Sequence, residues 1–527
     1  MNFQNKNILI YGYGKSGQSA SKLLEKFAKN IFIYDQKLSV KILNKNEKIL
    51  KNNKKINIFS KKIRFFNNFN EIKNKKIHFC ILSPGVDTSN SEVVFLKKMG
   101  IRIMSELELG AYFCKGKIFA ITGTNGKTTT STLLHHIFTH AQKETFLCGN
   151  VGTPISEIAP QTTENSLIVC EVSSFQLETT KHFKPFSSVI LNLADDHLDR
   201  HKSLEAYGKC KDKINNHFAT KKIFNVEDNN LINYSKKYLN SLNFNAKNNF
   251  FIKNNSKIYK LIEKNNLIGD FNKQNLISAC IMARLVKIDD ITIQGAIQSF
   301  KGLPHRLEVI FENETLRIIN DSKSTNPHST ISALDAVGKN TILLLGGSGK
   351  DLDFTPIFEK EFLHCIAYGE TRNKIFDSAN NIPHINKPAI NLTIKEKFKD
   401  AILSALELAN KIICEDNLEK NNKNKLKNNK NKKNILKNAK NNEKTNIFLQ
   451  NNKNEIKKKN QHNADFSISL NQQSPNLDSS TQLQNDTSTP QKLTILLSPA
   501  CASFDEFTSY EERGKVFGEI IHHLLTH

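Results

Sequence analysis

The 527-residue chain lacks tryptophan, and it also lacks the long apolar runs and paired cysteines that mark several classes of protein. No apolar run approaches the roughly 18–20 residues that cross a bilayer, so we expect no membrane insertion. The first residues, MNFQNKNILIYGYG, enter a strand-like pattern without the cationic start and long apolar middle of a signal peptide. The nine cysteines form no CxxC pair or zinc-like spacing, which indicates reduced thiols in a cytoplasmic protein.

Acidic residues are fewer than basic ones, and the net charge of +24 suggests binding to nucleic acid. However, residues 417–460 contain fourteen lysines and three glutamates, so about half of the excess charge lies in one segment. That segment has almost no aromatic side chains on which bases could stack. Residues 461–491 continue as Ser, Thr, Gln and Asn. We therefore predict a disordered Asn/Lys-rich insertion at 415–491 and no nucleic-acid partner.

The order of apolar runs predicts an α/β fold with mostly parallel sheets, because strand-like runs alternate with helical patterns. Three such series are present, and 527 residues are too many for one core. The expected strands are 7–11, 31–35 and 77–85 in the first series, 117–123, 166–174 and 187–197 in the second, and 316–321, 341–347, 365–369 and 493–499 in the third, which ends in a helix at 510–525. We expect three domains: a Rossmann-like domain at 1–105, a central P-loop ATPase-like domain at 106–302, and a C-terminal Rossmann-like domain at 303–527 that contains the insertion.

The stretch GTNGKTTT at 123–130 follows a strand-like run and opens a helical pattern. Glycines let backbone N–H groups converge on a phosphate at a helix N-terminus, where Lys127 can reach the β- and γ-phosphates and Thr128 can face Mg²⁺. The loop is shorter than the usual pattern, since position 121 is Ile and the glycines are Gly123 and Gly126. A simple Gly-rich turn is the alternative, but the strand before it and the helix after it favour a phosphate site.

A second glycine-rich turn, GYGKSG at 12–17, also follows a strand, and Asp35 ends the next strand. This pattern is typical of dinucleotide sites, although a tight turn between strand and helix has the same letters. It indicates a phosphate-bearing ligand, with a nicotinamide dinucleotide as one candidate. The SPG sequence at 83–85 ends a third strand and is expected to line the same crevice.

Charged residues end several later strands. Glu171 ends one strand, and DDHLD at 195–199 follows another, so Glu171 and His197 are candidate Mg²⁺ ligands, whereas the aspartates are typical of a solvated turn. Lys209, Lys211 and Lys213 alone would be read as the exposed face of a helix. In the third series Lys323 and Lys350 follow two strands and Ser503 follows the last, which predicts a cationic pocket for carboxylates or phosphates.

These pieces, in this order, resemble the Mur ligases, ATP-dependent amide-forming enzymes of peptidoglycan precursor synthesis. The resemblance covers residues 1–410 and 493–527, and it rests on GTNGKTT, EVSSFQLE (171–178), DDHLDRH (195–201), GLPHRLE (302–308), NDSKSTN (320–326) and LLSPACASFDEF. The motifs of the third series resemble the members that add D-glutamate to UDP-N-acetylmuramoyl-L-alanine. For such a member, the γ-phosphate of ATP passes to the alanine carboxylate, and the amine of D-glutamate attacks the resulting acyl phosphate.

The resemblance also implies a monomer that binds only small-molecule substrates and uses ATP with Mg²⁺, expected as two ions, and it assigns residues to each ligand. Implied ATP contacts are Gly123, Thr124, Asn125, Gly126, Lys127, Thr128, Thr129, Asn272, Asn275, Arg306 and Asp321. Implied UDP-sugar contacts are Lys15, Ser16, Asp35, Gln36, Lys37, Ser83, Pro84, Gly85, Asn150, Ser173 and Gln176. Implied D-glutamate contacts are Thr325, Lys350, Ser503, Phe504 and Tyr510. Implied metal ligands are Thr128, Glu171, His197 and a carbamylated Lys211, and implied catalytic residues are Lys127, His197, Lys211 and Lys323.

Three other functions remain open from the residues. A folylpolyglutamate-synthase-like or other Mur-type ligase would share the later two domains, although the N-terminal nucleotide unit argues against the first of these. A nicotinamide-dependent dehydrogenase would use GYGKSG but leave GTNGKTT unexplained. A basic nucleic-acid-binding ATPase would depend on the Asn/Lys segment.

Overall fold

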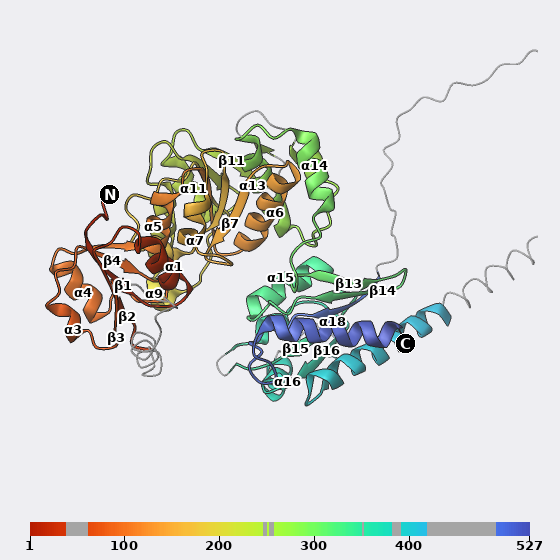
Figure 1. Ribbon diagram of the computed structural model, residues 1–527. Helices are drawn as coiled ribbons and strands as arrows, with labels where there is room; N and C mark the ends of the chain where they lie inside the picture. The colour runs from red at the N-terminus through yellow and green to blue at the C-terminus, as the bar shows by residue number, and fades with distance from the viewer. Residues whose placement is uncertain are drawn as a thin grey trace, which may run out of the picture. The chain divides into compact units, whose positions relative to one another are not determined.

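The computed structural model describes residues 1–37, 62–245, 250–251, 258–349, 352–381, 391–418 and 492–526. The chain divides into two compact units, Met1–Leu303 and Pro304–His527. The first unit contains two sheets and the second contains one, each flanked by helices (Figure 1). Strands pair in parallel except at one edge of two sheets, which confirms the expected α/β class with mostly parallel sheets. The three domain ranges stay a prediction.

The N-terminal sheet has five parallel strands in the order β3-β2-β1-β4-β5. Its elements are β1 (Asn7–Tyr11), α1 (Lys15–Leu24), β2 (Asn30–Tyr34), β3 (Ile63–Phe66), α3 (Asn70–Lys73), β4 (Phe79–Leu82), α4 (Ser91–Lys98), β5 (Arg102–Ser105) and α5 (Glu106–Phe113). Alternate residues face opposite sides of the sheet, so Ile8 and Ile10 pack with α1, whereas Leu9 and Tyr11 pack with α3 and α4. The strand order reverses between β1 and β4, and ligands bind at the carboxyl ends of strands beside such a reversal.

The second sheet has seven strands in the order β12-β11-β10-β9-β6-β8-β7. Its strands are β6 (Lys117–Thr122), β7 (Thr145–Gly149), β8 (Leu167–Glu171), β9 (Ser187–Ile190), β10 (Lys221–Asn225), β11 (Leu242–Asn245) and β12 (Phe250–Phe251). Its helices are α6 (Lys127–His140), α7 (Ile155–Ile158), η1 (Ala159–Gln161), α8 (Ser174–Leu177), α9 (Leu198–His201), α10 (Leu204–Asp212), η2 (Lys213–Asn215), α11 (Asn229–Lys236), α12 (Ile258–Ile262), α13 (Phe271–Arg284) and α14 (Asp290–Ser299). Strands β8 and β9 flank β6, so their carboxyl ends lie on either side of the loop that follows β6.

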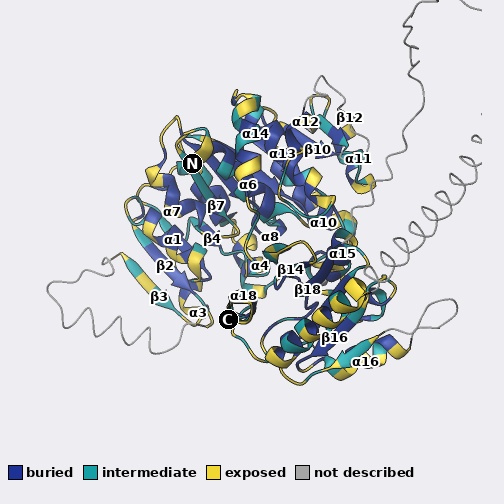
Figure 2. Cartoon of the chain, turned by 90° about the vertical axis from the view of Figure 1, so that its right-hand side faces the viewer, coloured by how far each residue is buried: buried dark blue, intermediate teal, exposed yellow. Residues whose placement is uncertain are grey.

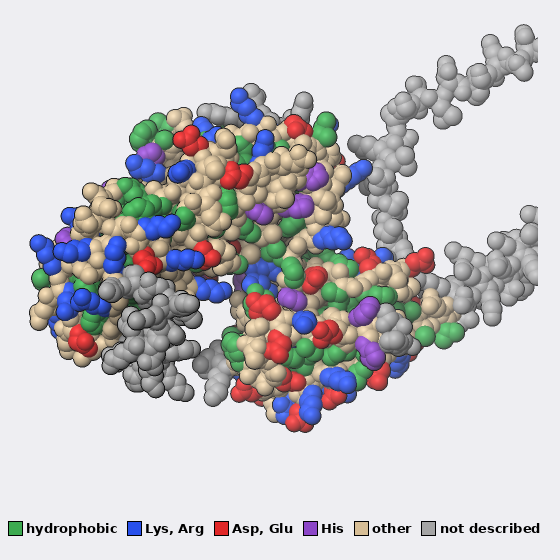
Figure 3. All heavy atoms as spheres, viewed as in Figure 1, with side chains coloured by type: hydrophobic (Ala, Val, Ile, Leu, Met, Phe, Trp, Pro, Cys, Tyr) green, Lys and Arg blue, Asp and Glu red, His purple; other side chains and the backbone are tan. Residues whose placement is uncertain are grey.

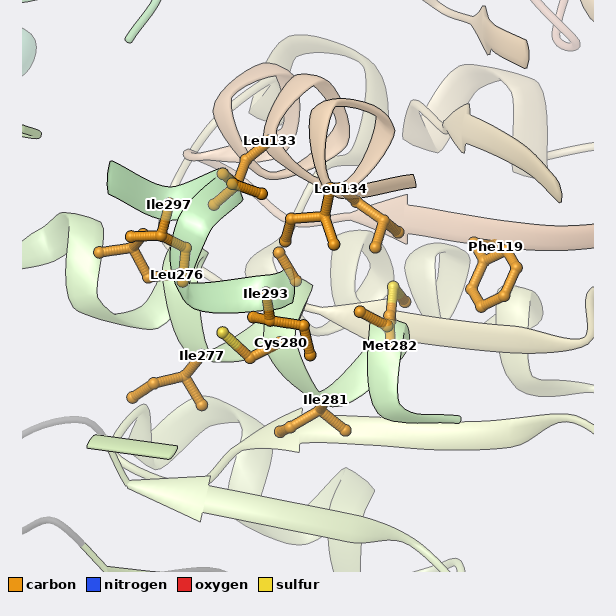
Figure 4. Close-up of a cluster of buried hydrophobic side chains, with 14 of the residues drawn as sticks. Phe119, Leu133, Leu134, Leu276, Ile277, Cys280, Ile281, Met282, Ile293 and Ile297 are labelled. Atoms are coloured by element: carbon orange, nitrogen blue, oxygen red, sulfur yellow. The ribbon is translucent and has the colours of Figure 1, made fainter. Parts of the chain in front are cut away.

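The larger core of this sheet lies under α6, α13 and α14 (Figure 4). Phe119 of β6 belongs to this core together with Leu133 and Leu134 of α6, and its ring centroid lies 5.0 Å from that of Phe138 on the same helix. Helix α13 is buried continuously from Leu276 to Ala283, as expected for a helix that packs on more than one side. This packing fixes the helix that follows the phosphate loop against the sheet.

The second unit has a six-stranded sheet in the order β13-β14-β18-β15-β16-β17. Its elements are β13 (Glu308–Glu312), β14 (Leu316–Asn320), α15 (Pro327–Val337), β15 (Thr341–Gly346), η3 (Thr355–Ile357), β16 (His364–Tyr368), α16 (Arg372–Asn380), β17 (Leu392–Ile394), β18 (Leu493–Leu497) and α18 (Tyr510–Thr526). Residues 398–418 are also helical, so the helix continues past residue 415, where the insertion was expected to begin. Residues 419–491 lie outside the described part. Strand β18 follows them and pairs with both β14 and β15, which places it inside the sheet.

Burial follows this layered arrangement. The central strands are buried, whereas exposed residues lie on the outer sides of helices, in loops and on edge strands such as β3 (Figure 2). Lys and Arg side chains are interspersed with Asp and Glu over the visible face of each unit (Figure 3). Among the described residues, no helix has both the length and the apolar composition needed to cross a membrane.

Candidate active site

The loop between β6 and α6 has the backbone geometry of a phosphate-binding turn. Gly123 and Gly126 have φ values of 151° and 82°, in the region that favours glycine. A Cβ on Gly126 would lie 2.2 Å from Oδ1 of Asn275. A side chain at this position is therefore excluded both by the backbone conformation and by the lack of space. The loop is anchored to the end of β9, because the Asn125 N–H donates to Oδ1 of Asn192 at 2.8 Å. Its shape is therefore set before any ligand binds.

Lys127 is the first residue of α6, and its ammonium group folds back over the loop. It donates to the carbonyl oxygens of Gly123 at 2.9 Å and Thr124 at 2.7 Å. Thr128 and Thr129 follow in the first turn of the helix, where N–H groups and the helix dipole favour an anion. The structure thus brings the seven predicted loop residues together around one helix N-terminus.

Glu171 lies beside this loop at the carboxyl end of β8. Its side chain is buried, and its Oε1 accepts a hydrogen bond from Nδ2 of Asn150 at 3.2 Å. Its Oε2 is buried without a hydrogen-bond partner among the described residues. Because buried acceptors are almost always satisfied, an unpaired carboxylate oxygen fits a hard cation such as Mg²⁺.

Lys211 is buried under the same loop, whereas Lys209 on the same helix is exposed and pairs with Glu205. The Lys211 Nζ donates to the Gly123 carbonyl at 2.9 Å and lies 4.3 Å from the centre of the Tyr207 ring. Burial, with a smaller effect of Lys127, lowers its pKa from 10.5 to about 7. The reading of this lysine as part of an exposed helix face is therefore wrong, because α10 packs that position inward. Near neutral pH, Lys211 is therefore an uncharged amine in a large fraction of the molecules.

His197 precedes α9 in a left-handed conformation, with φ 53°. Its ring packs on Phe175, with centroids 4.8 Å apart, and its Nε2 lies 3.5 Å from Oδ2 of Asp196. Asp195 is exposed, as expected for a solvated turn. Within the described residues, no three His, Cys, Asp or Glu side chains gather as a metal cluster. Magnesium commonly uses one or two protein ligands together with phosphate oxygens and water.

Two predicted ATP contacts, Asn272 and Asn275, lie at the start of α13 and are buried. Asn275 accepts from the Thr130 hydroxyl at 3.1 Å and donates to Oδ1 of Asn272 at 2.8 Å. Asn272 in turn donates to the Ile268 carbonyl at 2.8 Å. Asn275 therefore ties α13 to the first turns of α6, directly after the phosphate loop, and Asn272 supports Asn275 in the same hydrogen-bonded chain.

The predicted UDP-sugar residues of the N-terminal sheet gather at the carboxyl ends of β1, β2 and β4. The Ser83 hydroxyl donates to the Gly12 carbonyl at 2.8 Å, and Gly12 has φ 91°. Asp35 accepts from the Tyr13 N–H at 2.7 Å and the Lys37 N–H at 2.8 Å. The remaining members are Lys15 and Ser16 in the first turn of α1, Gln36, which donates to the Tyr34 hydroxyl, and Pro84 and Gly85 after Ser83. These groups flank the point where the strand order reverses.

Ser173 and Gln176 cap the short helix α8, which follows Glu171. The Gln176 Oε1 accepts from the Ser173 N–H at 3.0 Å, and the Ser173 hydroxyl accepts from the Gln176 N–H at 3.3 Å. Reciprocal capping of this kind fixes the direction in which the chain leaves β8. The predicted path of the sugar is thus close in sequence to the candidate metal ligand.

In the second unit, Asp321 ends β14 and is buried. It accepts hydrogen bonds from the Ser324 and Ser498 hydroxyls at 2.5 and 2.9 Å and from the Leu307 N–H at 3.2 Å. Burial outweighs these contacts and raises its pKa from 3.8 to about 6. Arg306, the residue before Leu307, is half-buried.

The described members of the predicted D-glutamate site lie in the segments that follow the neighbouring strands β14 and β18, as does the predicted catalytic residue Lys323. The Lys323 Nζ donates to the Tyr510 hydroxyl at 2.5 Å and lies 4.1 Å from the centre of its ring. Ser503 is buried, whereas Phe504 is 73% exposed and donates its N–H to the Ser348 hydroxyl. Thr325 is half-buried near Lys323 in sequence. Lys350 lies outside the described residues.

One buried cation, Arg513 on α18, was not expected from the sequence. Its guanidinium donates to the Ser322 hydroxyl at 3.0 Å and to the carbonyls of Ser322, Cys501 and Ala502 at 2.9–3.2 Å. It therefore joins the segment after β14 to the segment after β18. Nothing in the local pattern around Arg513 distinguishes it from a surface arginine, so only the fold identifies it.

The model of the Mur ligase middle domain matches residues 121–283. A UDP-N-acetylmuramoylalanine–D-glutamate ligase of Caldanaerobacter subterraneus subsp. tengcongensis is 32% identical over 427 residues, which cover 78% of this chain and 92% of the relative. The enzyme of the same name from Lachnoclostridium phytofermentans is 35% identical over 407 residues, covering 72% and 87%. Among solved structures, UDP-N-acetylmuramate-alanine ligase MurC from Thermotoga maritima aligns with a TM-score of 0.45 at 18% identity, covering 76% of this chain and 92% of that one.

Proposed function

The chain belongs to the Mur ligase family, and on that basis we propose that it joins D-glutamate to UDP-N-acetylmuramoyl-L-alanine with cleavage of ATP to ADP and phosphate. It is an ATP-dependent amide ligase of peptidoglycan precursor synthesis. We place the reaction in the cytoplasm and propose a monomer that acts on small molecules.

A carboxylate is a poor acyl donor, so the reaction needs a leaving group. The alanine carboxylate attacks the γ-phosphorus of ATP, which forms an acyl phosphate and releases ADP. The amine of D-glutamate then attacks the acyl carbon, loses a proton, and the tetrahedral intermediate expels phosphate to leave an amide. The protein contributes mainly by orienting three substrates and neutralising the phosphates.

The observation that most supports this proposal is the convergence of Gly123–Thr128, Glu171 and Lys211 on one helix N-terminus. The backbone N–H groups and Lys127 suit the β- and γ-phosphates, since Lys127 already lies across the loop. Because the loop is held by Asn192 and Asn275, binding requires little ordering of the backbone. The alanine carboxylate would approach from the side of Asn150, Ser173 and Gln176.

Glu171, the Thr128 hydroxyl and His197 are the residues that would hold Mg²⁺, and we propose two ions. The unpaired buried Oε2 of Glu171 supports this assignment. When bound, Mg²⁺ neutralises the charge that develops on the phosphate oxygens. Asn150 holds the other carboxylate oxygen of Glu171 and so orients it.

We further propose that Lys211 is carbamylated. Its amine is buried and its pKa is about 7, so the uncharged form that attacks CO₂ is well populated at neutral pH. The nitrogen forms a bond to the carbon of CO₂ and loses one proton, which leaves an anionic carbamate. That change replaces a buried cation with an oxygen ligand suited to Mg²⁺. Nuclear magnetic resonance of the protein in ¹³C-bicarbonate tests this: we expect a carbamate ¹³C resonance in the wild type that is missing from Lys211→Met. Persistence of the resonance in the variant would contradict the proposal.

The second unit supplies the proposed contacts of D-glutamate, a dicarboxylate. The proposed contacts come from segments that follow two neighbouring strands, and they are Thr325, Ser503, Phe504 and Tyr510. Lys323, in the same segment as Thr325, is the proposed catalytic residue of this unit, and Arg513 adds a buried positive charge. Lys350 remains a proposed member from the sequence. Arg306 and Asp321 are the proposed ATP contacts of this unit.

One assay tests the proposed function. The protein is mixed with ATP, Mg²⁺, UDP-N-acetylmuramoyl-L-alanine and radiolabelled D-glutamate, and the labelled UDP-muramoyl dipeptide is measured with ADP. We expect one ADP for each labelled product. Incorporation of L-glutamate or diaminopimelate in place of D-glutamate would refute the substrate assignment. Deletion of residues 419–490 is expected to leave the ligase activity unchanged. An ATPase that depends on nucleic acid bound to this segment would instead lose its activity.

A further inference from the structure

Arg200 on α9 donates four side-chain hydrogen bonds and stacks on an aromatic ring. Its Nε and Nη2 donate to the two carboxylate oxygens of Glu178 at 2.8 and 2.6 Å. Its Nη1 donates to the Pro84 carbonyl at 3.2 Å, and its Nη2 also donates to the Val86 carbonyl at 3.0 Å. The guanidinium carbon lies 4.4 Å from the centre of the Phe175 ring.

These contacts join two different sheets. Pro84 and Val86 belong to the turn after β4, and Ser83 of that turn bonds Gly12 at the reversal of strand order in the N-terminal sheet. Glu178 directly follows α8, the helix that leaves β8 after Glu171. Phe175 lies on the same helix and also packs on the His197 ring. Arg200 thus links the turn after β4 in the first sheet to the helix that follows Glu171, the candidate metal ligand at the end of β8 in the second.

We propose that Arg200 is a positioning residue that sets the Ser83–Val86 turn against α8, so that a UDP-sugar held at this turn presents its carboxylate to the phosphate loop. The inference rests on the proposed function and adds a residue to it. Arg200 itself touches no reacting atom in this arrangement. Its effect passes through the two carbonyl groups that it fixes on one side and through Phe175 on the other.

The chemistry of the pair explains why an arginine is required. Arg200 and Glu178 side chains are 14% and 12% exposed, so the ion pair is largely desolvated and each charge depends on the other. A planar guanidinium can bind a carboxylate with one edge and still donate to two carbonyls and stack on a ring. A lysine keeps the charge but offers a single nitrogen, which cannot reach Glu178 and both carbonyls at these distances.

The test compares Arg200→Lys with Arg284→Lys as a matched control. Arg284 also forms a two-bond pair, with Asp290 at 2.8 and 2.8 Å, and is 17% exposed, but it lies at the far end of α13 from the loop. Binding of UDP-N-acetylmuramoyl-L-alanine and, separately, of ATP with Mg²⁺ is measured by calorimetry on the full chain. The KM of each substrate is measured as well, together with the melting temperature.

We expect Arg200→Lys to raise the Kd and KM of the UDP-sugar about tenfold, because hydrogen bonds from a charged group to two fixed carbonyls are lost. The values for ATP are expected to stay within about twofold, and Arg284→Lys is expected to leave both substrates within that range. Glu178→Gln keeps the shape of the partner and is expected to give a smaller rise of the same kind, so it decides the question if Arg200→Lys does not fold.

A purely structural tie gives a different result. If the variants lower the melting temperature but leave UDP-sugar binding within twofold, or weaken ATP binding equally, the inference is wrong. Wild-type protein that binds no UDP-sugar would refute the proposed function and this inference together. Wild-type protein that binds it as tightly as Arg200→Lys would refute only the inference.

Discussion

Gly126→Ala is the sharpest perturbation of the phosphate loop, because it adds one methyl group at the position where the loop enters α6. Gly126 has φ 82°, and the new Cβ would lie 2.2 Å from Oδ1 of Asn275. Asn275 cannot move aside freely, since it is buried and bonds both the Thr130 hydroxyl and Asn272. The substitution therefore disturbs both the loop and the start of α13.

The size of the effect follows from these contacts. The left-handed conformation costs an alanine about 1–2 kcal/mol. Displacing Asn275 loses two hydrogen bonds, each worth about 1 kcal/mol. The sum is about 3 kcal/mol, which corresponds to about a hundredfold weaker binding of ATP if the loop must return to its present shape.

The assay is a double-mutant cycle on ATP affinity, measured by calorimetry with Mg²⁺. Asn275→Ala removes the oxygen that the methyl group would strike, so the double variant is expected to lose about 2 kcal/mol less than the sum of the single variants. Gly152→Ala is the control, because Gly152 has φ 80° but nothing within 4 Å of an added Cβ. It reports conformational strain alone and is expected to leave ATP affinity unchanged.

Two results would refute this reasoning. Additive effects of Gly126→Ala and Asn275→Ala would show that the two positions do not compete for the same space. An ATP affinity of Gly126→Ala within twofold of wild type would show that the loop binds phosphate in some other conformation, or not at all.

Three further predictions concern buried charges. Lys211 has a folded pKa below its unfolded value, so the wild-type protein loses stability as pH falls toward 7. Lys211→Met lacks this titration, so in CO₂-free buffer the free energy of unfolding of wild type is expected to rise relative to that of the variant by about 3 kcal/mol from pH 6 to 9. A difference that does not change with pH would contradict this. Asp321 has the opposite sign, because its raised pKa favours the folded state below pH 4 and this stability is lost as pH rises through about 6. In thermal melts, the stability of Asp321→Asn relative to wild type is therefore expected to increase by about 1.4 kcal/mol between pH 5 and 8. Arg513→Lys removes the donors that the guanidinium supplies to the buried carbonyls of Ser322 and Cys501, so we expect a loss of about 3 kcal/mol and a raised KM for D-glutamate. An unchanged melting temperature would contradict this.

The strands that the sequence predicted are mostly buried on both faces, although the largely buried β5 and β10 were not predicted. NILIY, KIFAIT and LTILL form β1, β6 and β18. They are continuous apolar runs because a parallel sheet covered by helices on both faces has no solvent-exposed face. The edge strands β3 and β17 were not predicted. Their residues are mostly half-buried, so their composition differs little from that of a loop.

Glycine-rich turns were also readable from the sequence, because the constraint acts on the residue itself. At Gly12, Gly123 and Gly126 the backbone has positive φ, and the neighbouring strand and helix are adjacent in the chain. Such a turn is local, so its letters are enough to predict it. The candidate phosphate loop therefore did not depend on knowing the sheet order.

The sequence by itself thus determined the α/β class, the buried strands and the loops that end them, since these depend on residues close together in the chain. Only the tertiary structure decided which distant side chains meet there. It placed Lys211 under Gly123, 88 positions away, and turned an apparently exposed lysine into a buried amine. It also brought Arg200 to Pro84 and Arg513 to Ser322. These contacts depend on strand order and helix packing, which the local periodicity of the sequence does not encode.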